Sequence, residues 1–221
     1  MSHLKRQKVP KNWPIERKGT KFVVRPSSNL DRGIPLLIVL RDILKLAKTR
    51  NEVKRAINTR RVLVNKKPVI EDKISLTLFD TLSNLASKKN YRINLKDNGK
   101  ITVDEIEEKE ANKKISRIIN KTVLKKGKIQ VNLDDGRNYL VDNKFKFNIN
   151  DSALIDFNEN KITKIIPLKE NSKILVYKGK HAGKIGYIKK IIFEKKLIEL
   201  ETTGESKEKI NVLISYGVAI E

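Results

Sequence analysis

The sequence predicts a multi-domain α+β protein, and three observations lead to that prediction. Apolar residues recur at helical spacing between about residues 35 and 57. From residue 91 onward, short runs of alternating apolar and polar residues are separated by turn sequences, as in β-hairpins. The first 34 residues follow neither pattern. We therefore expect a basic arm (1–34), a helix–helix–hairpin unit (35–90), a β-rich central domain (91–168) and a small C-terminal barrel (169–221).

The N-terminal arm is predicted to be irregular. Pro10, Pro14 and Pro26 interrupt it, and its basic residues outnumber its acidic ones. Such a segment buries little apolar surface by itself, so we expect it to lack fixed structure or to fold against a partner. Trp13, the only tryptophan, either anchors the arm on the protein's own core, which we favour, or contacts the partner.

Residues 35–48 are predicted to form the first helix. Pro35 suits the first turn of a helix, where its missing N–H is not needed. Arg41, Lys45 and Lys48 recur at intervals of four and three residues, so we expect them to share one face. The apolar residues share another face, and they are Leu36, Leu37, Leu40, Ile43, Leu44 and Ala47.

A second helix is predicted over residues 49–58. Thr49 and Glu52 have the spacing of a capping box, in which each side chain accepts a hydrogen bond from a free backbone N–H at the helix start. Three apolar residues face inward, namely Val53, Ala56 and Ile57. The cations left on the surface are Lys54, Arg55 and Arg61.

A short basic hairpin is predicted to follow the second helix. The sequence RRVLVNKKPVI (60–70) indicates two strands joined by a tight turn at residues 65–67. Two helices and a hairpin would brace a surface on which cations converge with few acids among them. Those cations are Arg41, Lys54, Arg55, Arg60, Arg61, Lys66 and Lys67.

The central domain is predicted to consist mainly of hairpins, and we interpret it as scaffold. Turns are expected at Asn98–Gly99, at Asp135–Gly136 and near residues 158–160. Residues 104–119 are the exception: acidic residues come first and basic residues last, which matches the dipole of a helix. The C-terminal segment contains four short apolar-alternating runs separated by glycine and lysine turns, which is typical of a small SH3-like barrel.

The net charge points to a polyanionic partner. The chain carries 49 lysines and arginines against 26 acidic residues, a formal charge of +23. Residues 1–67 hold 19 of the basic residues and only 4 of the acidic ones. A compositional bias toward lysine would spread evenly along the chain, whereas this charge is concentrated. We therefore expect the N-terminal part of the chain to form a contact surface for an anionic partner, namely nucleic acid.

Several classes of function are disfavoured. The chain has no cysteine, which excludes disulfides, thiolate nucleophiles and zinc fingers and is consistent with an intracellular protein. The longest apolar run (34–40) is far short of a membrane span, and no signal peptide is evident. The segment GKHAGKIG (179–186) is not a nucleotide-binding loop, because neither Ser/Thr nor a helix follows its lysine. His3 and His181 have no ligand or triad spacing. We expect no catalytic site, metal or cofactor.

With these segments placed, the sequence resembles the archaeal/eukaryotic-type ("e" type) ribosomal protein number four of the small ribosomal subunit. The matching segments run in order along nearly the whole chain: HLKR (3–6), PKNWPI (10–15), VRPSSN (24–29), IPLLIVLRDILKLAKTRNEVKRAI (34–57), VLVNKKPVIEDKI (62–74), INDSALIDFNENKITKII (149–166) and GKHAGKIGYI (179–188). The chain ends soon after ISYGVAIE, without the basic C-terminal extension of eukaryotic members, which favours an archaeal member.

The resemblance implies an alpha-L RNA-binding domain for residues 40–68 and a KOW motif for residues 176–190. Gly179, Gly183 and Gly186 fall on the glycine positions of the KOW motif. The alpha-L hairpin often has glycine where Lys66 stands. Because Asn65 accepts a left-handed conformation, we expect the turn to survive with altered geometry.

The resemblance implies a structural component of the small ribosomal subunit that binds and stabilises folded ribosomal RNA and is located on cytoplasmic ribosomes. Neighbouring ribosomal proteins are implied partners, whereas a membrane, a small-molecule substrate and a homo-oligomer are not expected. Two alternatives remain, a free regulatory or transcription-associated KOW factor and, less favoured, an RNA-modifying enzyme. The residues predicted to bind RNA are Lys5, Arg6, Lys8, Lys11, Trp13, Arg25, Arg41, Lys45, Lys54, Arg55, Arg60, Arg61, Lys66, Lys67, Lys178, Lys180, His181 and Lys184.

Overall fold

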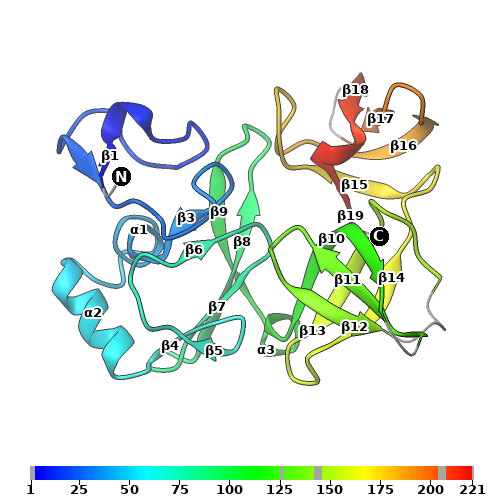
Figure 1. The fold of residues 1–221 in the computed structure, drawn as a ribbon. Helices are drawn as coiled ribbons and strands as arrows, with labels where there is room; N and C mark the ends of the chain where they lie inside the picture. Colours follow the sequence, from blue (N-terminus) through cyan, green and yellow to red (C-terminus); the bar gives the residue numbers. More distant parts are fainter. Residues whose placement is uncertain (1–2, 125–126, 142–145, 204–207, 221) are drawn as a thin grey trace. The chain divides into compact units, whose positions relative to one another are not determined.

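The structure is a computed structural model that describes residues 3–124, 127–141, 146–203 and 208–220. It contains two compact units. The first comprises Met1–Lys96 and Lys100–Asn112, and the second comprises Asp97–Gly99 and Lys113–Glu221. Strands dominate both units, and the labelled helices belong to the first (Figure 1). None of the helices in the described ranges is long and apolar enough to cross a membrane.

The first unit contains three antiparallel sheets. Two of them are strand pairs, β1–β2 and β3–β6, and the third has the order β5-β4-β7-β8-β9. Its α-helices are α1 (Leu36–Ile38), which continues into a π-helical turn (Val39–Ile43), α2 (Arg50–Asn58) and α3 (Glu108–Ala111), and a short 3-10 helix spans Arg6–Lys8. Its strands are β1 (Leu4–Lys5), β2 (Phe22–Val23), β3 (Ile34–Pro35), β4 (Val62–Val64), β5 (Lys67–Pro68), β6 (Ser75–Leu76), β7 (Thr81–Asn84), β8 (Lys89–Leu95) and β9 (Ile101–Ile106).

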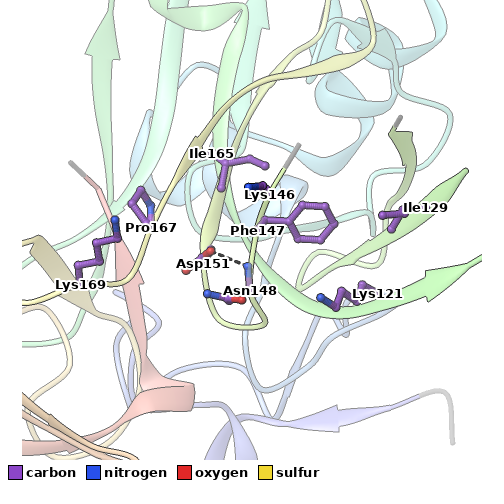
Figure 2. Close-up of a pocket in the computed structure, with 9 residues that line it drawn as sticks. All are labelled: Lys121, Ile129, Lys146, Phe147, Asn148, Asp151, Ile165, Pro167 and Lys169. Atoms are coloured by element: carbon purple, nitrogen blue, oxygen red, sulfur yellow. Dashed lines mark hydrogen bonds between the residues drawn. The ribbon is translucent and has the colours of Figure 1, made fainter. Parts of the chain in front are cut away.

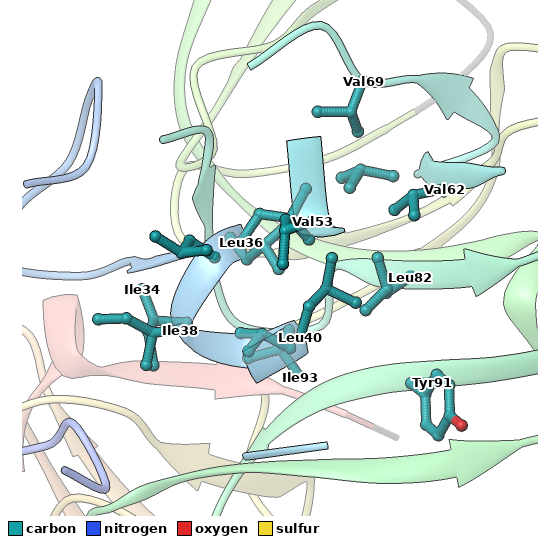
Figure 3. Packing of buried hydrophobic residues seen from close by; sticks show 14 of the residues in the cluster. Ile34, Leu36, Ile38, Leu40, Val53, Val62, Val69, Leu82, Tyr91 and Ile93 are labelled. Atoms are coloured by element: carbon teal, nitrogen blue, oxygen red, sulfur yellow. The ribbon is translucent and has the colours of Figure 1, made fainter. Parts of the chain in front are cut away.

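The core of the first unit forms where α1, α2 and the five-stranded sheet meet. Side chains from both helices and from β4, β7 and β8 converge in it (Figure 3). Residues 36–40 are all buried, so this segment is surrounded by protein rather than half exposed. The prediction of a helix over residues 35–48 is wrong in its length. Regular α-helix ends at Ile38, a π turn follows, and Lys45 has a left-handed backbone with φ of 53°.

The N-terminal arm packs on this same core. Leu4 and Trp13 belong to the buried cluster, and the Trp13 indole N–H donates a hydrogen bond to the carbonyl of Gly33 at 3.1 Å. Arg6 closes the arm on itself by donating to the carbonyls of Glu16 and Thr20, both at 2.7 Å. The favoured interpretation of Trp13 as an anchor is confirmed. The expectation that the arm lacks structure without a partner is wrong, because these contacts order it within the chain.

Helix α2 begins as predicted. The Glu52 N–H donates to Thr49 Oγ1 at 3.3 Å, and Glu52 Oε2 accepts from the Lys48 N–H at 2.8 Å. The hydrogen bond from Lys48 is the largest cause that holds the pKa of Glu52 below its ordinary value. A carboxylate with a lowered pKa stabilises the fold above its unfolded pKa, and that contribution is lost as the pH falls through its folded pKa.

Removing the cap gives a first testable prediction. Thr49→Ala deletes the side-chain acceptor at the start of α2 and should cost about 1 kcal/mol of unfolding free energy. Urea titration followed by the fluorescence of Trp13 reports on the first unit, because this buried residue is the only tryptophan. Thr163→Ala, in the second unit, is the control and should leave the Trp13 transition in place.

The predicted helix over residues 104–119 is wrong. Only Glu108–Ala111 is helical, whereas Ile101–Ile106 and Lys113–Val123 are strands. Pairing of β9 with β8, and of β10 (Lys113–Val123) with both β11 (Ile129–Leu133) and β13 (Ser152–Asp156), satisfies the backbone and overrides the charge pattern. The boundary predicted at residues 90 and 91 falls within β8, which pairs with both β7 and β9. The first unit therefore extends to Asn112, apart from residues 97–99.

The second unit contains two five-stranded antiparallel sheets. Their strand orders are β12-β11-β10-β13-β14 and β18-β17-β16-β15-β19. Each sheet contributes side chains to its own cluster of buried apolar residues. The hairpins predicted at Asp135–Gly136 and near residues 158–160 are present. The strands are β10 (Lys113–Val123), β11 (Ile129–Leu133), β12 (Asn138–Val141), β13 (Ser152–Asp156), β14 (Lys161–Ile166), β15 (Lys173–Val176), β16 (Ile185–Ile192), β17 (Leu197–Thr202), β18 (Lys209–Leu213) and β19 (Gly217–Ala219).

Candidate nucleic-acid interface

The C-terminal end of α2 directs two arginines toward solvent. The Arg60 N–H donates to the carbonyl of Ile57 at 2.8 Å, and the Arg61 N–H donates to that of Ala56 at 3.1 Å. This is a Schellman motif, whose left-handed position is occupied here by Arg60 with φ of 53°. Glycine is the usual residue at that position. The helix end is therefore closed while a guanidinium is displayed where most proteins have no side chain.

Hydrogen bonds to buried residues hold the β4–β5 turn in place. Asn65 and Lys66 have φ of 50° and 62°, so the turn survives without glycine, with both residues left-handed. The buried Asn65 amide donates to Asp80 Oδ1 at 2.7 Å, and Asn65 Oδ1 accepts from the Thr81 N–H at 3.0 Å. Asp80 Oδ2 also accepts from the N–H of Thr77. Asn65 is thus fixed inward, and Lys66 and Lys67 follow at the tip.

These elements define what we call the basic platform. Lys45, Lys54, Arg55, Arg60, Arg61 and Lys67 are exposed and Lys66 is half-buried. Within the described residues, none of the seven forms a salt bridge. All seven lie on α2, on the turn before α2 or on the segment that runs from the end of α2 through β5. The platform consists of Lys45, Lys54, Arg55, Arg60, Arg61, Lys66 and Lys67.

Arg41 differs from the platform cations. Its guanidinium donates to both carboxylate oxygens of Asp42, each at 2.9 Å. This hydrogen bonding raises the pKa of Arg41. The Asp42 carboxylate therefore neutralises the charge of Arg41 locally. The sequence-based prediction counted Arg41 among the contact residues and did not take this pairing into account.

The structure separates the predicted residues of the arm into two groups. Lys5, Lys8 and Lys11 are exposed, and Arg25 is half-buried. Arg6 is occupied by its contacts with Glu16 and Thr20, which include a bond to Thr20 Oγ1 at 2.8 Å. The Trp13 side chain is only 3% exposed, so the prediction that it contacts RNA is corrected: it belongs to the core.

The glycine–lysine loop after β15 needs its glycines. Gly179 and Gly183 have φ of 90° and 94°, and a Cβ on Gly186 would lie 2.5 Å from the carbonyl oxygen of Glu201. The loop displays less free charge than its sequence indicates. Lys184 pairs with Glu208 at 2.6 Å, which lowers the pKa of Glu208, and the Lys178 ammonium lies 5.6 Å from the Tyr216 ring. Lys180 is exposed and His181 is half-buried.

A second basic surface, which the sequence did not indicate, lies in the central β-rich segment. A cavity of about 660 Å³ is lined by the lysines Lys121, Lys146 and Lys169 around an apolar floor (Figure 2). Asp151, on the same wall, is occupied by the N–H groups of Asn148 and Leu168. These lysines lie on β10, before β13 and after β14, so they are far apart in the sequence and only the fold brings them together.

The described residues contain no cluster of three or more histidine, aspartate or glutamate side chains able to hold a metal ion. The basic platform consists of exposed and half-buried cations on backbone that is braced by a buried core. A surface on which like charges gather attracts ions of the opposite charge.

Comparison with known proteins identifies related chains. Residues 87–162 match the family model described as Ribosomal family S4e, residues 2–28 match the RS4NT (NUC023) domain and residues 34–70 match the S4 domain. Small ribosomal subunit protein eS4 of Methanothermobacter thermautotrophicus is 38% identical over 192 residues, which cover 86% of this chain and 78% of that protein. Its counterpart in Nanoarchaeum equitans is 35% identical over 214 residues, covering 93% of this chain and 91% of that protein.

A solved structure supports the fold. The crystal structure of 30S ribosomal protein S4e from Thermoplasma acidophilum superposes with a TM-score of 0.72 and 24% sequence identity. The superposition covers 86% of this chain and 95% of that one.

Proposed function

Because this chain belongs to the S4e family of small ribosomal subunit proteins, we propose that it is a non-catalytic component of the small subunit on cytoplasmic ribosomes, where it binds and stabilises folded ribosomal RNA. The observation that carries the proposal is the basic platform. Its seven cations lie in or beside the segment that matches the S4 domain, and none has an ionic partner among the described residues.

The mechanism follows from charge and shape. Each platform cation that meets a phosphate releases a condensed counterion, so affinity should fall steeply as salt rises. The major groove of A-form RNA is too narrow for side chains, so folded RNA is recognised by its backbone, its shape and its unpaired bases. A platform braced by a buried core is suited to backbone contacts, because its cations are positioned before binding. Neighbouring ribosomal proteins would complete the site.

The C-terminal segment is the second proposed RNA contact. Its five-stranded sheet, together with left-handed Gly179 and Gly183, supports a KOW module with an SH3-like barrel over residues 169–221. Because Lys184 is paired with Glu208, we expect this loop to contribute less affinity than the platform. Lys178, Lys180 and His181 are its contact candidates. Arm residues Lys5, Lys8, Lys11 and Arg25 extend the first contact.

Co-sedimentation tests this function. We expect nearly all of the protein in a cell lysate to sediment with small ribosomal subunits at low salt and to be released as salt is raised. A predominantly free pool at low salt would contradict the proposal and favour a free regulatory factor. Turnover of ribosomal RNA by the pure protein would also contradict it.

Lys66→Gly gives a prediction that separates binding from folding. Glycine accepts the left-handed φ of 62° at this position at least as well as lysine, so the unfolding free energy should be unchanged or slightly higher. The loss of one phosphate contact should reduce the slope of log affinity against log salt by about 1. Binding of the wild type and variant to small-subunit RNA across a salt series measures this. Asn160→Gly, also left-handed but uncharged, is the control and should leave the slope unchanged.

A further inference from the structure

An exposed phenylalanine stands at the edge of a basic hollow on the N-terminal arm. Phe22 is 46% exposed and lines a hollow of about 330 Å³ in the first unit. None of the described residues that line this hollow is acidic. They are His3, Phe22, Val23, Val24, Arg25, Arg50 and Lys73, and we call this site the arm hollow.

The strand register explains why Phe22 faces outward. In the β1–β2 pair, near the N-terminus in Figure 1, Leu4 is opposite Val23 and Lys5 is opposite Phe22. Side chains alternate along a strand, so Leu4 turns into the core while Lys5 and Phe22 share the exposed face. The large apolar ring is thus beside a lysine on the outer face, although burying it would be more favourable for folding.

The backbone under the ring is firmly held. The Arg6 N–H donates to the carbonyl of Lys21 at 3.0 Å, and the guanidinium of Arg6 binds both the carbonyl and the hydroxyl of Thr20. The Thr20 hydroxyl in turn donates to the carbonyl of Phe22 at 3.1 Å. These bonds fix the strand independently of any partner, so binding a ligand at the ring would cost little ordering entropy.

The surroundings of the ring favour an anion that carries a flat group. The Lys21 ammonium lies 5.5 Å from the Phe22 centroid, and the His3 ring meets it edge-on at 5.4 Å. Arg50, which also lines the hollow, pairs with the buried Asp72, and this pair fixes the guanidinium in place. Lys73 is exposed beside it. An aromatic face among cations is the arrangement that holds an unstacked nucleobase together with its phosphate.

Two other aromatic positions do not offer the same combination. Phe147, in the cavity of Figure 2, has a Lys121 ammonium 5.8 Å from its ring but is only 8% exposed, so it has no face for stacking. Phe193 is 74% exposed at the β16–β17 turn but lines neither the arm hollow nor the cavity of Figure 2.

We propose that the arm hollow is a stacking site for an unpaired nucleotide of single-stranded RNA, with Phe22 as the platform for the base and Lys5, Lys21 and Lys73 neutralising the adjacent phosphates. The inference rests on the proposed function, because it assigns part of the RNA contact to a base rather than to the backbone. It differs from the basic platform in requiring a ring, and it predicts discrimination between single-stranded and duplex RNA.

The test compares single-stranded RNA, which offers unpaired bases, with polyanions that offer none. The full chain is titrated at one salt concentration with each of four fluorescent ligands: a single-stranded twelve-nucleotide RNA, a duplex RNA of equal length, inorganic polyphosphate and polyglutamate. Phe22→Leu should weaken binding of the single strand by about 5- to 150-fold, the effect of losing one stacked base, and leave the other three unchanged. Phe22→Trp keeps a ring and should keep the affinity, and its added fluorescence should be quenched by the single strand alone.

Matched variants and the wild type keep the outcomes distinct. Phe193→Leu removes an exposed ring elsewhere and should change none of the affinities. Unchanged Trp13 fluorescence verifies that Phe22→Leu is folded, and an unchanged circular-dichroism spectrum verifies the same for Phe22→Trp. Equal loss for Phe193→Leu, equal loss on polyphosphate or polyglutamate, or no loss on the single strand would overturn the stacking site while leaving RNA binding intact. Failure of the wild type to bind any RNA would instead overturn the proposed function and the stacking site together.

Discussion

Reversing the charge of Arg60 and Arg61 together is expected to abolish incorporation of the protein into small subunits while leaving its fold intact. Each reversal removes a phosphate contact and adds a repelling carboxylate. We expect the salt slope of RNA binding to fall by about 2 or more, and affinity near physiological salt to fall roughly 100-fold. Both side chains are exposed and make no ion pair within the described residues, so folding should tolerate the change.

Two controls isolate the position of the charge from its amount. Lys161→Glu with Lys164→Glu changes the net charge equally, but on exposed positions of β14, and should retain incorporation. Arg60→Gly removes one cation and places glycine at the left-handed position of the Schellman motif, so it should be at least as stable as the wild type and bind RNA more weakly. Quantitative sedimentation of tagged variants with small subunits measures incorporation. Equal incorporation of the two double variants would show that the platform assignment is wrong.

Asp80→Ala is expected to have the largest effect on stability. Asp80 is 5% exposed and accepts hydrogen bonds from the Asn65 amide and from the N–H and hydroxyl of Thr77. Removing the carboxylate leaves the buried Asn65 amide without this acceptor and releases the β4–β5 turn. We expect a loss of about 3 kcal/mol or more, since each buried polar group left unpaired costs about 1–3 kcal/mol.

Trp13 provides the measurement for this variant too, because it reports unfolding of the first unit. Asp104→Ala is the control: Asp104 lies in the same unit and accepts a hydrogen bond from Asn94, but it is exposed. Its cost should stay within about 0.5 kcal/mol. Equal destabilisation by the two variants would mean that the buried network does not hold the turn. Platform binding should weaken for Asp80→Ala even below its unfolding transition, since Lys66 loses its support.

The elements that local rules determine were predictable. Thr49 and Glu52 mark the start of α2 because a capping box needs only residues three apart. The turn at Asn65 followed from the tolerance of asparagine for the left-handed region. The glycines of the C-terminal loop are required for φ or for close approach, as their spacing indicated. Each of these features depends on a few neighbouring residues, which a single sequence contains.

The features that failed depend on distant partners. The helix over residues 104–119 was inferred from charge order, but Ile115 and Ile118 lie in a strand that pairs with β13 and β11. The first helix was predicted to be too long because the apolar pattern continues to Ala47, whereas the left-handed backbone of Lys45 ends the helical turns. The arm is ordered by Arg6 bonding to carbonyls 10 and 14 residues away.

The site shows the same division. Six of the seven platform cations are exposed and Lys66 is half-buried, and the sequence indicated all seven because clusters of like charge are visible in it. The neutralisation of Arg41 by Asp42 and of Lys184 by Glu208 depends on side-chain geometry, and the second pair is 24 residues apart. Phe22 escaped notice because a single phenylalanine in an irregular segment has no pattern. Its exposure becomes evident only when the β1–β2 register is known.

Ultraviolet crosslinking of intact small subunits, with identification of the crosslinked peptides and nucleotides by mass spectrometry, tests the central claim most directly. We predict crosslinks between small-subunit ribosomal RNA and peptides that contain the basic platform, with a second, weaker group from the loop around Lys180. Crosslinks confined to other surfaces, with the platform peptides free of RNA, would contradict the assignment of this surface as the principal RNA contact.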